Sequence, residues 1–263
     1  MQLPGGLVEN GLRLRDWSFR PVSGDLELGL AEVGEEASNA PQAVTRALAL
    51  ALERLSSKTA TPERVAGLCV ADRQFLMREL DRHLGCEGDW FQTDCAHCDA
   101  RFDFRLDYAE LPVQEAGEGY PIAHVEWDDR RLSFRLPTGS DQEMLANLPD
   151  AKAKPWLLRR LANEPEALGT PSEAFIALVE EALDAMSPGV VLRVQSTCPE
   201  CGADNQVGLD PYRVIDRRSN DLLMEIHQIA SHYHWSETEI LKLPRTRRQR
   251  YLQIIDRARG MTE

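Results

Sequence analysis

Two Cys-x-x-C motifs at a fixed separation are the feature that most constrains the fold of this chain. Cys95 and Cys98 recur as Cys198 and Cys201, 103 positions further on. The same separation aligns further identical residues around the cysteines without a gap: Gln92 with Gln195, Ala100 with Ala203, Leu106 with Leu209, and Asp107 with Asp210. An internal repeat of this kind predicts two related structural units.

A second pair of matching segments lies upstream of the cysteines. The sequence SFRPVSG (18–24) corresponds to SFRLPTG (133–139) at a separation of 115. The segment VQEAGEGYP, rich in glycine, glutamate and proline, is typical of a connection between such units. We therefore predict two divergent copies of one module, at 1–112 and 122–214, followed by a third segment at 219–263.

Hydrophobic periodicity and capping residues predict an α+β fold. Each module is expected to consist of helices followed by a Cys-x-x-C turn between two strands, which we call a knuckle: 95–98 in the first module and 198–201 in the second. Thr61 is expected to cap a helix that has Pro62 at its first position. Asp128 and Asp129 are expected at the tip of a hairpin. The remaining expected helices are 41–55, 71–85, 154–164 and 171–186, and 189–197 is expected to be a strand.

The third segment predicts a small unit of three helices. Ser236 and Glu239 form a capping box for a short helix, which Pro244 ends. The first helix is expected to bury one face, consisting of Leu222, Leu223, Ile226, Ile229, Ala230 and Tyr233. The last helix is expected to bury Tyr251, Leu252, Ile254 and Ile255 and to leave its arginines outside.

The two cysteine pairs together supply the four thiolates of a closed tetrahedral zinc site. Packing two related modules about a pseudo-twofold axis would bring the distant pairs together, so we expect one structural Zn²⁺ shared by Cys95, Cys98, Cys198 and Cys201. Separate sites, or no metal, are the alternatives. His97 is expected to be a surface residue, and Cys69 and Cys86 to be small buried hydrophobes.

A closed set of four thiolates leaves no coordination position for water or substrate, which argues against a catalytic zinc. The sequence contains no nucleophile elbow, no phosphate-binding glycine loop and no H-E-x-x-H motif. Both Cys-x-x-C motifs follow strand-like sequence rather than opening a helix, which disfavours a thioredoxin-like role. The prediction is a protein that is not an enzyme, with no catalytic residues and no small-molecule substrate.

The charge distribution bears on possible partners. The formal net charge of −13 argues against nucleic acid or an anionic membrane as the partner of the body of the chain. Residues 242–259 are locally basic, with seven Lys or Arg against one acid. We predict that Arg247, Arg248 and Arg250, with Trp235 nearby, bind an acidic partner, while Trp235 and Tyr251 hold the helices together. A solvated helix face is the alternative.

The order of these motifs resembles that of the baseplate hub assembly family of T-even-type contractile phages and its relatives in prophages and extracellular contractile injection systems. The resemblance is carried by DRQFL before the first knuckle, FRLPTG, CPECG followed by LD, and HYHWSETEILKLPRTRRQRYL. It implies a non-enzymatic baseplate component or assembly factor whose partners are other baseplate, hub or spike proteins. It also implies a location in the cytoplasm during assembly, or in the baseplate of a phage or phage-like particle.

A zinc-ribbon adaptor or regulator that binds nucleic acid or another protein is the alternative to this function. Nucleic-acid binding by the knuckles would require basic and aromatic residues around the cysteines. The knuckles instead carry acidic residues: Asp94, Asp99, Asp103, Glu200 and Asp204. The sequence also has no run of eighteen apolar residues and no secretory signal at its start, so we expect neither membrane insertion nor export.

Overall fold

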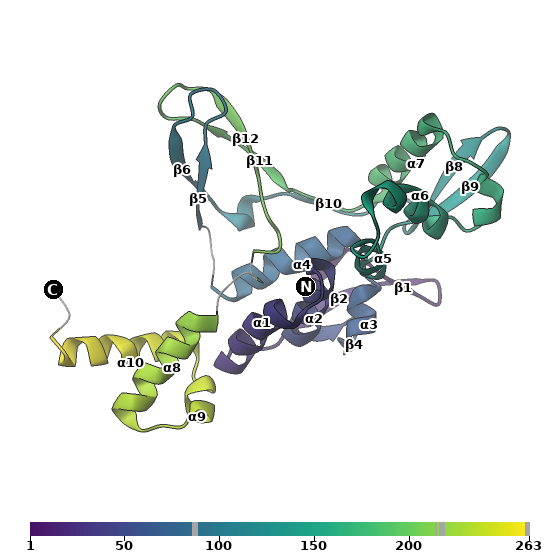
Figure 1. Cartoon of the computed structure of the whole chain (residues 1–263). Coiled ribbons are helices and arrows are strands. Elements are labelled where there is room, and N and C mark those ends of the chain that lie inside the picture. Colours follow the sequence, from purple (N-terminus) through teal and green to yellow (C-terminus); the bar gives the residue numbers. More distant parts are fainter. Residues whose placement is uncertain (86–88, 214, 216–218, 261–263) are drawn as a thin grey trace.

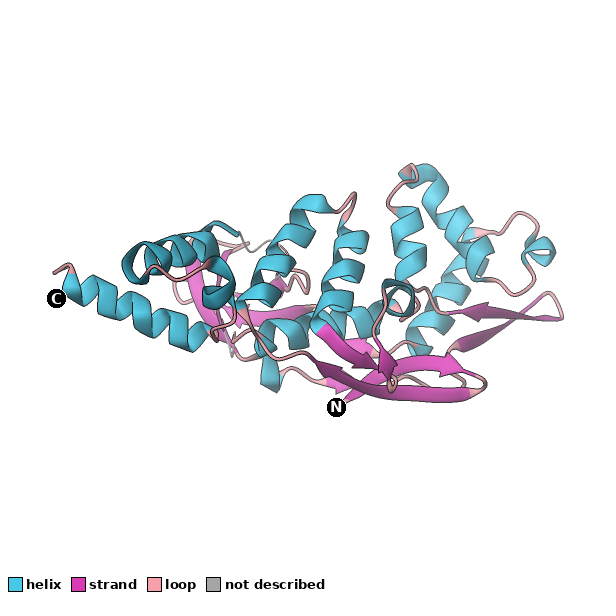
Figure 2. Cartoon of the chain, turned by 90° about the horizontal axis from the view of Figure 1, so that it is seen from below, coloured by secondary structure: helices cyan, strands magenta, loops and turns pink. Residues whose placement is uncertain are grey.

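The computed structural model of the chain describes residues 1–85, 89–213, 215 and 219–260. It is an α+β structure, as predicted. The described elements form an elongated arrangement, with the C-terminal helices at one end and the hairpin of β8 (Ile122–Trp127) and β9 (Arg130–Arg135) at the other (Figures 1 and 2). The two knuckle hairpins project together from the helical body (Figure 1).

The N-terminal region is a small antiparallel sheet covered by helices. Its strands have the order β1-β2-β3-β4. The strands are β1 (Gln2–Glu9), β2 (Leu12–Phe19), β3 (Leu52–Leu55) and β4 (Lys58–Thr59). The helices are α1 (Gly24–Glu36), α2 (Ala40–Ala51), α3 (Pro62–Ala66) and α4 (Val70–His83). Thr61 caps α3 and Pro62 opens it, as predicted.

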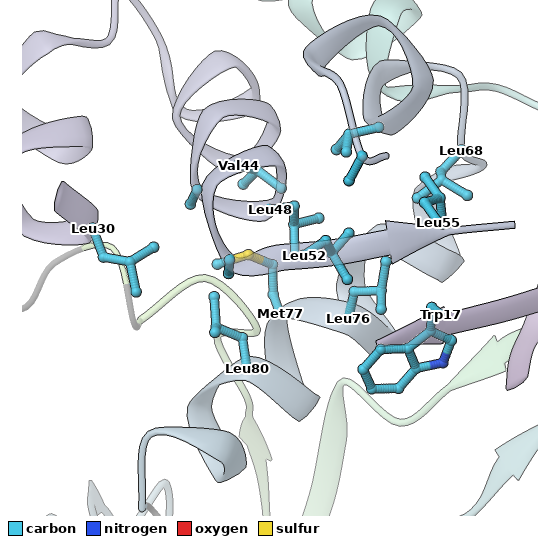
Figure 3. Packing of buried hydrophobic residues seen from close by; sticks show 14 of the residues in the cluster. Trp17, Leu30, Val44, Leu48, Leu52, Leu55, Leu68, Leu76, Met77 and Leu80 are labelled. Carbon is cyan, nitrogen blue, oxygen red and sulfur yellow. The ribbon is translucent and has the colours of Figure 1, made fainter. Parts of the chain in front are cut away.

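The largest hydrophobic core lies between this sheet and its helices. Leu48, Leu52 and Leu76 are fully buried in it, and Trp17 is a buried member of the same cluster (Figure 3). Tyr212 and Ile215, which follow the second knuckle in sequence, also pack against this cluster. The segment after the second knuckle therefore returns to the N-terminal core.

The sequence-based prediction of a helix over 41–55 is wrong at its end. Helix α2 stops at Ala51, and 52–55 form strand β3, in which Leu55 pairs with Trp17 of β2. Pairing with β2 supplies hydrogen bonds for this backbone, so the tertiary context overrides the local helix propensity. The β1–β2 hairpin itself was not predicted, although the Asn10-Gly11 pair at its tip is a hairpin turn signal.

The second helical region begins with a hairpin. Asp128 and Asp129 occupy its two-residue turn with φ of 49° and 57°, as predicted. Its strands are β8 (Ile122–Trp127) and β9 (Arg130–Arg135). Its helices are α5 (Gly139–Leu145), α6 (Asp150–Leu161), the 3₁₀ helix η2 (Pro165–Leu168) and α7 (Glu173–Met186). Helix α5 packs against α2, α3 and α4, which joins the two helical regions.

The two S-F-R-x-x-[ST]-G segments occupy equivalent places in these regions. Each runs from the second strand of a hairpin to the start of a helix, with Ser23 as N-cap of α1 and Thr138 as N-cap of α5. The glycine that follows each cap lies against another element. A Cβ atom on Gly24 would lie 2.8 Å from the backbone of Leu241, and one on Gly139 would lie 2.2 Å from Arg73 Nη1. Both glycines therefore permit a close approach that a side chain would block.

The first residues of the connection between the two regions are held by contacts with other parts of the chain. Strand β7 (Val113–Gln114) pairs with β10 (Gly189–Val190). Glu115 binds Arg15 with an N–O distance of 2.8 Å. The predicted strand 189–197 is accordingly divided, because its first two residues pair with β7 and its remainder forms part of the second knuckle hairpin.

The C-terminal segment contains three helices, as predicted. They are α8 (Ser219–Tyr233), α9 (Glu237–Leu241) and α10 (Arg245–Ala258). The Ser236–Glu239 capping box is present at the start of α9. Leu223 and Ile254, predicted to be buried, are instead 43% and 50% exposed. Their helices turn the neighbouring Leu222 and Ile255 into the small core, so these two side chains fall on the outer faces.

The predicted module boundaries stay a prediction, although the buried residues of three hydrophobic clusters each fall within one predicted segment. Separate clusters occupy the N-terminal region, the second helical region and the C-terminal helices. The knuckle cluster takes Cys95 and Phe102 from the first module and Cys198 from the second. In the described part of the chain, no helix is long and apolar enough to cross a membrane.

Candidate metal centre

Each cysteine pair lies in the turn of a short antiparallel hairpin. The first hairpin is formed by β5 (Asp89–Asp94) and β6 (Arg101–Leu106), and the second by β11 (Arg193–Thr197) and β12 (Asp204–Gly208). Residues between the strands turn back tightly, so the two cysteines of each pair face the same end of the hairpin. The hairpins lie side by side (Figure 1), and this places the two turns together.

The two knuckles have the same backbone hydrogen bonds. Cys95 N donates to Ala100 O at 2.9 Å, and Cys198 N donates to Ala203 O at the same distance. A second bond closes each turn, from Asp99 N to Cys95 O at 3.0 Å and from Gly202 N to Cys198 O at 2.9 Å. Asp99 and Gly202 both have a positive φ, of 56° and 72°. Corresponding atoms are separated by 103 positions in every case.

The four sulfur atoms fit a tetrahedral metal site. The Sγ atoms of Cys95, Cys98, Cys198 and Cys201 all lie within 4.8 Å of one another. The distance from Cys95 Sγ to Cys201 Sγ is 3.6 Å, and that from Cys98 Sγ to Cys198 Sγ is 3.8 Å. A tetrahedron with zinc–sulfur bonds of about 2.3 Å has edges of about 3.8 Å. A disulfide would need about 2.05 Å, so these are four separate thiols whose spacing suits one tetrahedral ion.

The site is buried on one side and open to solvent on the other. Cys95 and Cys198 are buried against Phe102, while Cys98 and Cys201 are exposed. The site therefore joins the two hairpins at their common end, and apolar side chains, including Phe102, pack against its buried side. His97 is exposed, as predicted, and its backbone N–H donates to Cys95 Sγ at 3.4 Å.

The pKa values of the clustered thiols show that four thiolates here would require a compensating charge. Hydrogen bonding from the backbone of His97 lowers the pKa of Cys95 to about 6. The backbone of Ala100 favours the Cys98 thiolate, but the neighbouring thiols of Cys201, Cys95 and Cys198 raise the pKa of Cys98 to about 12. Sulfur atoms this close cannot all ionise unless a positive charge compensates them. A divalent ion supplies that charge and takes four thiolates as ligands.

Asn205 is a residue of the site that the sequence analysis missed. It is buried, its Oδ1 accepts from Ala96 N at 2.9 Å, and its Nδ2 lies 3.6 Å from Cys95 Sγ. It therefore reaches from the second hairpin to the first knuckle. One signal for it was present in the sequence. The separation of 103 positions aligns Asn205 with Phe102, which faces inward, and a buried amide side chain requires hydrogen-bond partners. Hydrogen bonds of this type orient the ligand and tune the metal.

The arrangement can hold a metal ion but offers it no open position. Four sulfur ligands complete a tetrahedral shell, so a bound zinc would have no place for a water or substrate molecule. Among the described residues, these four cysteines form the one group of three or more possible metal ligands. Cys69 is buried in a separate apolar cluster, as predicted, and Cys86 lies outside the described residues.

Comparison with known proteins gives no match. No family model, no curated protein sequence and no solved structure is significantly similar to this chain.

The structure distributes the predicted docking residues of α10 between the surface and the core. Arg247 and Arg250 are exposed. Arg248 is fully buried, with Nη2 at 2.8 Å from Glu27 Oε2 and Nε at 3.2 Å from Glu225 Oε2. The expectation that this arginine lies outside is therefore wrong, because two carboxylates of α1 and α8 compensate its charge inside the protein.

Trp235 has a packing role in the C-terminal unit. Its ring stacks on Tyr233 with centroids 5.1 Å apart and meets Tyr251 edge-on at 5.0 Å. These contacts agree with the prediction that Trp235 and Tyr251 hold the helices together. Whether Trp235 also contacts a partner stays a prediction.

Proposed function

We propose that this protein is a non-enzymatic structural or assembly component in which one zinc ion, shared by both cysteine pairs, fastens two divergent copies of a module. The observation that carries the proposal is the convergence of four Sγ atoms within 4.8 Å, from two hairpins that are distant in sequence. Their distances suit a tetrahedral site, and the complete thiolate shell favours a bracing role over catalysis.

Equivalent local structure supports the origin of the two halves by duplication. Helix α4 (70–83) and helix α7 (173–186) have the same length and start 103 positions apart, the separation of the cysteines. After each knuckle, an aspartate accepts a hydrogen bond from the residue two positions on, Asp107 from Ala109 N and Asp210 from Tyr212 N, both at 2.8 Å. Such agreement at a single offset is what divergent copies would retain.

Metal analysis and hydrogen exchange test the zinc brace. Protein purified without chelators should contain one zinc ion per chain, and His97→Ala should leave that ratio unchanged because His97 is not one of the clustered ligand residues. Removal of zinc should accelerate amide exchange in 89–106 and 193–208, whereas the core amides of α2 and α4 should keep their protection. Two zinc ions per chain would contradict a shared site, and no zinc would contradict the brace.

The specific proposal of a contractile-tail baseplate rests on the order of sequence motifs that resembles the baseplate hub assembly family. The lack of an open metal position and the presence of exposed basic residues on α10 are compatible with a scaffolding or assembly role. In that role, the protein would act through other baseplate, hub or spike proteins, during assembly in the cytoplasm or within the finished particle.

Gene context and deletion test the baseplate proposal. The neighbouring reading frames should encode sheath, tube and spike proteins. Deleting the gene should leave tubes and sheaths that fail to assemble on baseplates, as seen by electron microscopy, and a plasmid copy should restore assembly. Intact contractile particles in the deletion strain would overturn the proposal.

A zinc-ribbon adaptor that binds nucleic acid is less well supported. The acidic residues of both knuckles, including Asp94, Asp99 and Glu200, are exposed. Exposed carboxylates close in sequence to the cysteines repel phosphate groups. A gel-shift assay with duplex DNA and single-stranded RNA separates the two proposals, since the scaffold should shift neither.

A further inference from the structure

A groove lies where the C-terminal helices meet the end of α4. Its volume is about 730 Å³. Apolar groups line part of it, from Val22, Leu84 and Pro244. Arg245, Arg250 and Gln253 of α10 are among its polar lining residues. We call these six residues the basic groove.

The charge of this groove is opposite to that of the protein as a whole. Of its described lining residues none is acidic, whereas the complete chain has a net charge of −13. Arg245 donates to Leu84 O at 3.3 Å, which ties the start of α10 to the end of α4 and holds the groove together. Arg250 lines the groove and is exposed. The groove therefore offers a positive charge beside apolar surface.

The exposed side of α10 next to the groove also combines positive charge with apolar surface. Arg250, Ile254 and Arg257 follow one another at intervals of four and three residues, which places them on one side of a helix. All three are exposed, and Ile254 is 50% exposed. An apolar side chain with an arginine on either side complements an apolar residue with acidic residues on either side.

We propose that the basic groove, with Ile254 and Arg257 beside it, binds an acidic amphipathic segment of a partner protein. Carboxylates of the segment would pair with Arg250 and Arg257, and its apolar residues would cover Ile254 and the apolar part of the groove. A nucleic acid fits this surface less well, because its sugar-phosphate backbone would leave Ile254, Val22 and Leu84 without apolar contacts. This inference names the kind of partner that the proposed scaffold would bind, but it does not depend on a baseplate or on the zinc site.

A synthetic peptide in which pairs of glutamates alternate with pairs of leucines is the test probe. Fluorescence anisotropy of the labelled peptide should rise with the full-length protein, and added salt should weaken the binding. Arg250→Glu should weaken it about tenfold or more, and Ile254→Ser should weaken it to a smaller extent. Arg259→Glu is the matched control, because it makes the same charge change on the opposite side of α10 and should leave the affinity within about twofold.

Three results would overturn the proposal. The first is equal affinity of the wild type and Arg250→Glu for the acidic peptide, and the second is a preference for a peptide with lysine in place of glutamate. The third is displacement of the acidic peptide by single-stranded RNA. Dimerisation that Arg250→Glu abolishes, measured by analytical ultracentrifugation, would assign the groove to a second copy of the chain instead. Zinc content is measured in parallel, so that failure of the groove and failure of the zinc brace are distinguished.

Discussion

The Sγ atom of Cys95 lies 3.6 Å from that of Cys201, although 106 positions separate the two residues along the chain. This contact crosses from one knuckle to the other, as does the contact between Cys98 and Cys198. Neither knuckle could therefore complete the site alone. The metal position is formed only when both hairpins are in place, which couples metal binding to the folding of this part of the molecule.

The hydrogen bonds of Asn205 lead to a prediction about metal affinity. Asn205→Ala removes the contact from Nδ2 to Cys95 Sγ and leaves Ala96 N without its acceptor. We expect the variant to bind one zinc ion with about 10–100-fold lower affinity. Competition with a chelator of known affinity measures this change. Unchanged affinity would show that Asn205 only fills space between the hairpins.

Arg248 and Arg250 are predicted to differ sharply in their effect on stability. Arg248→Ala leaves Glu27 and Glu225 without their buried partner and should destabilise the C-terminal helices by about 3–5 kcal/mol. Arg250→Ala changes an exposed residue and should cost about 0.5 kcal/mol or less. Urea unfolding followed by circular dichroism compares the free energy of unfolding of the two variants. Similar losses for both would contradict an internal role of Arg248.

Asp141 should make the stability of the protein depend on acidic pH. Burial alone would raise the pKa of Asp141, but hydrogen bonds from Arg135, Thr138 N and Arg160 lower it to about 2 from 3.8. Because the pKa is lower in the folded state, the stabilisation is complete above about pH 4 and is lost as the pH falls towards 2. Its magnitude is about 2 kcal/mol.

The Asp141→Asn variant isolates this contribution. Its free energy of unfolding should be lower than that of the wild type near neutral pH, and the difference should shrink between about pH 4 and pH 2. Chemical denaturation at a series of pH values checks the expectation. A difference that stays constant over this range would assign the effect to packing rather than to ionisation.

Gly139 is predicted to be intolerant of any side chain. A Cβ atom there would lie 2.2 Å from Nη1 of the buried Arg73, which is held by Thr45 Oγ1 at 2.8 Å and cannot move freely. Gly139→Ala should destabilise the protein by about 1–3 kcal/mol. Gly208→Ala is the control, since a Cβ atom there meets nothing within 4 Å and should change stability by about 0.5 kcal/mol at most. Thermal unfolding measures the loss of stability in the two variants.

Much of the local structure follows from short-range patterns. The cap at Thr61, the turn at Asp128 and Asp129, and the capping box at Ser236 were all predicted from the sequence and are present. These features depend on residues within a few positions of one another. Strand β3 was missed for the opposite reason, because it pairs with β2 more than thirty positions earlier and its own sequence favours a helix.

The residues of the candidate metal site were likewise predictable only in part. The repeat at 103 positions identified all four cysteines, and the sharing of one ion could be inferred from the number of thiolates that zinc requires. Asn205 was not found, because its partners Ala96 and Cys95 lie on the other hairpin and become neighbours only after folding.

Sequence patterns were sufficient to predict the α+β fold class, the four clustered cysteines and the three C-terminal helices. That Arg248 is internal while Arg250 is exposed depends on how other helices pack against α10. Both arginines lie on the same basic helix, and their local sequence does not distinguish them. The difference arises because Glu27 and Glu225 come from other helices and supply compensating charge at one side of α10 only.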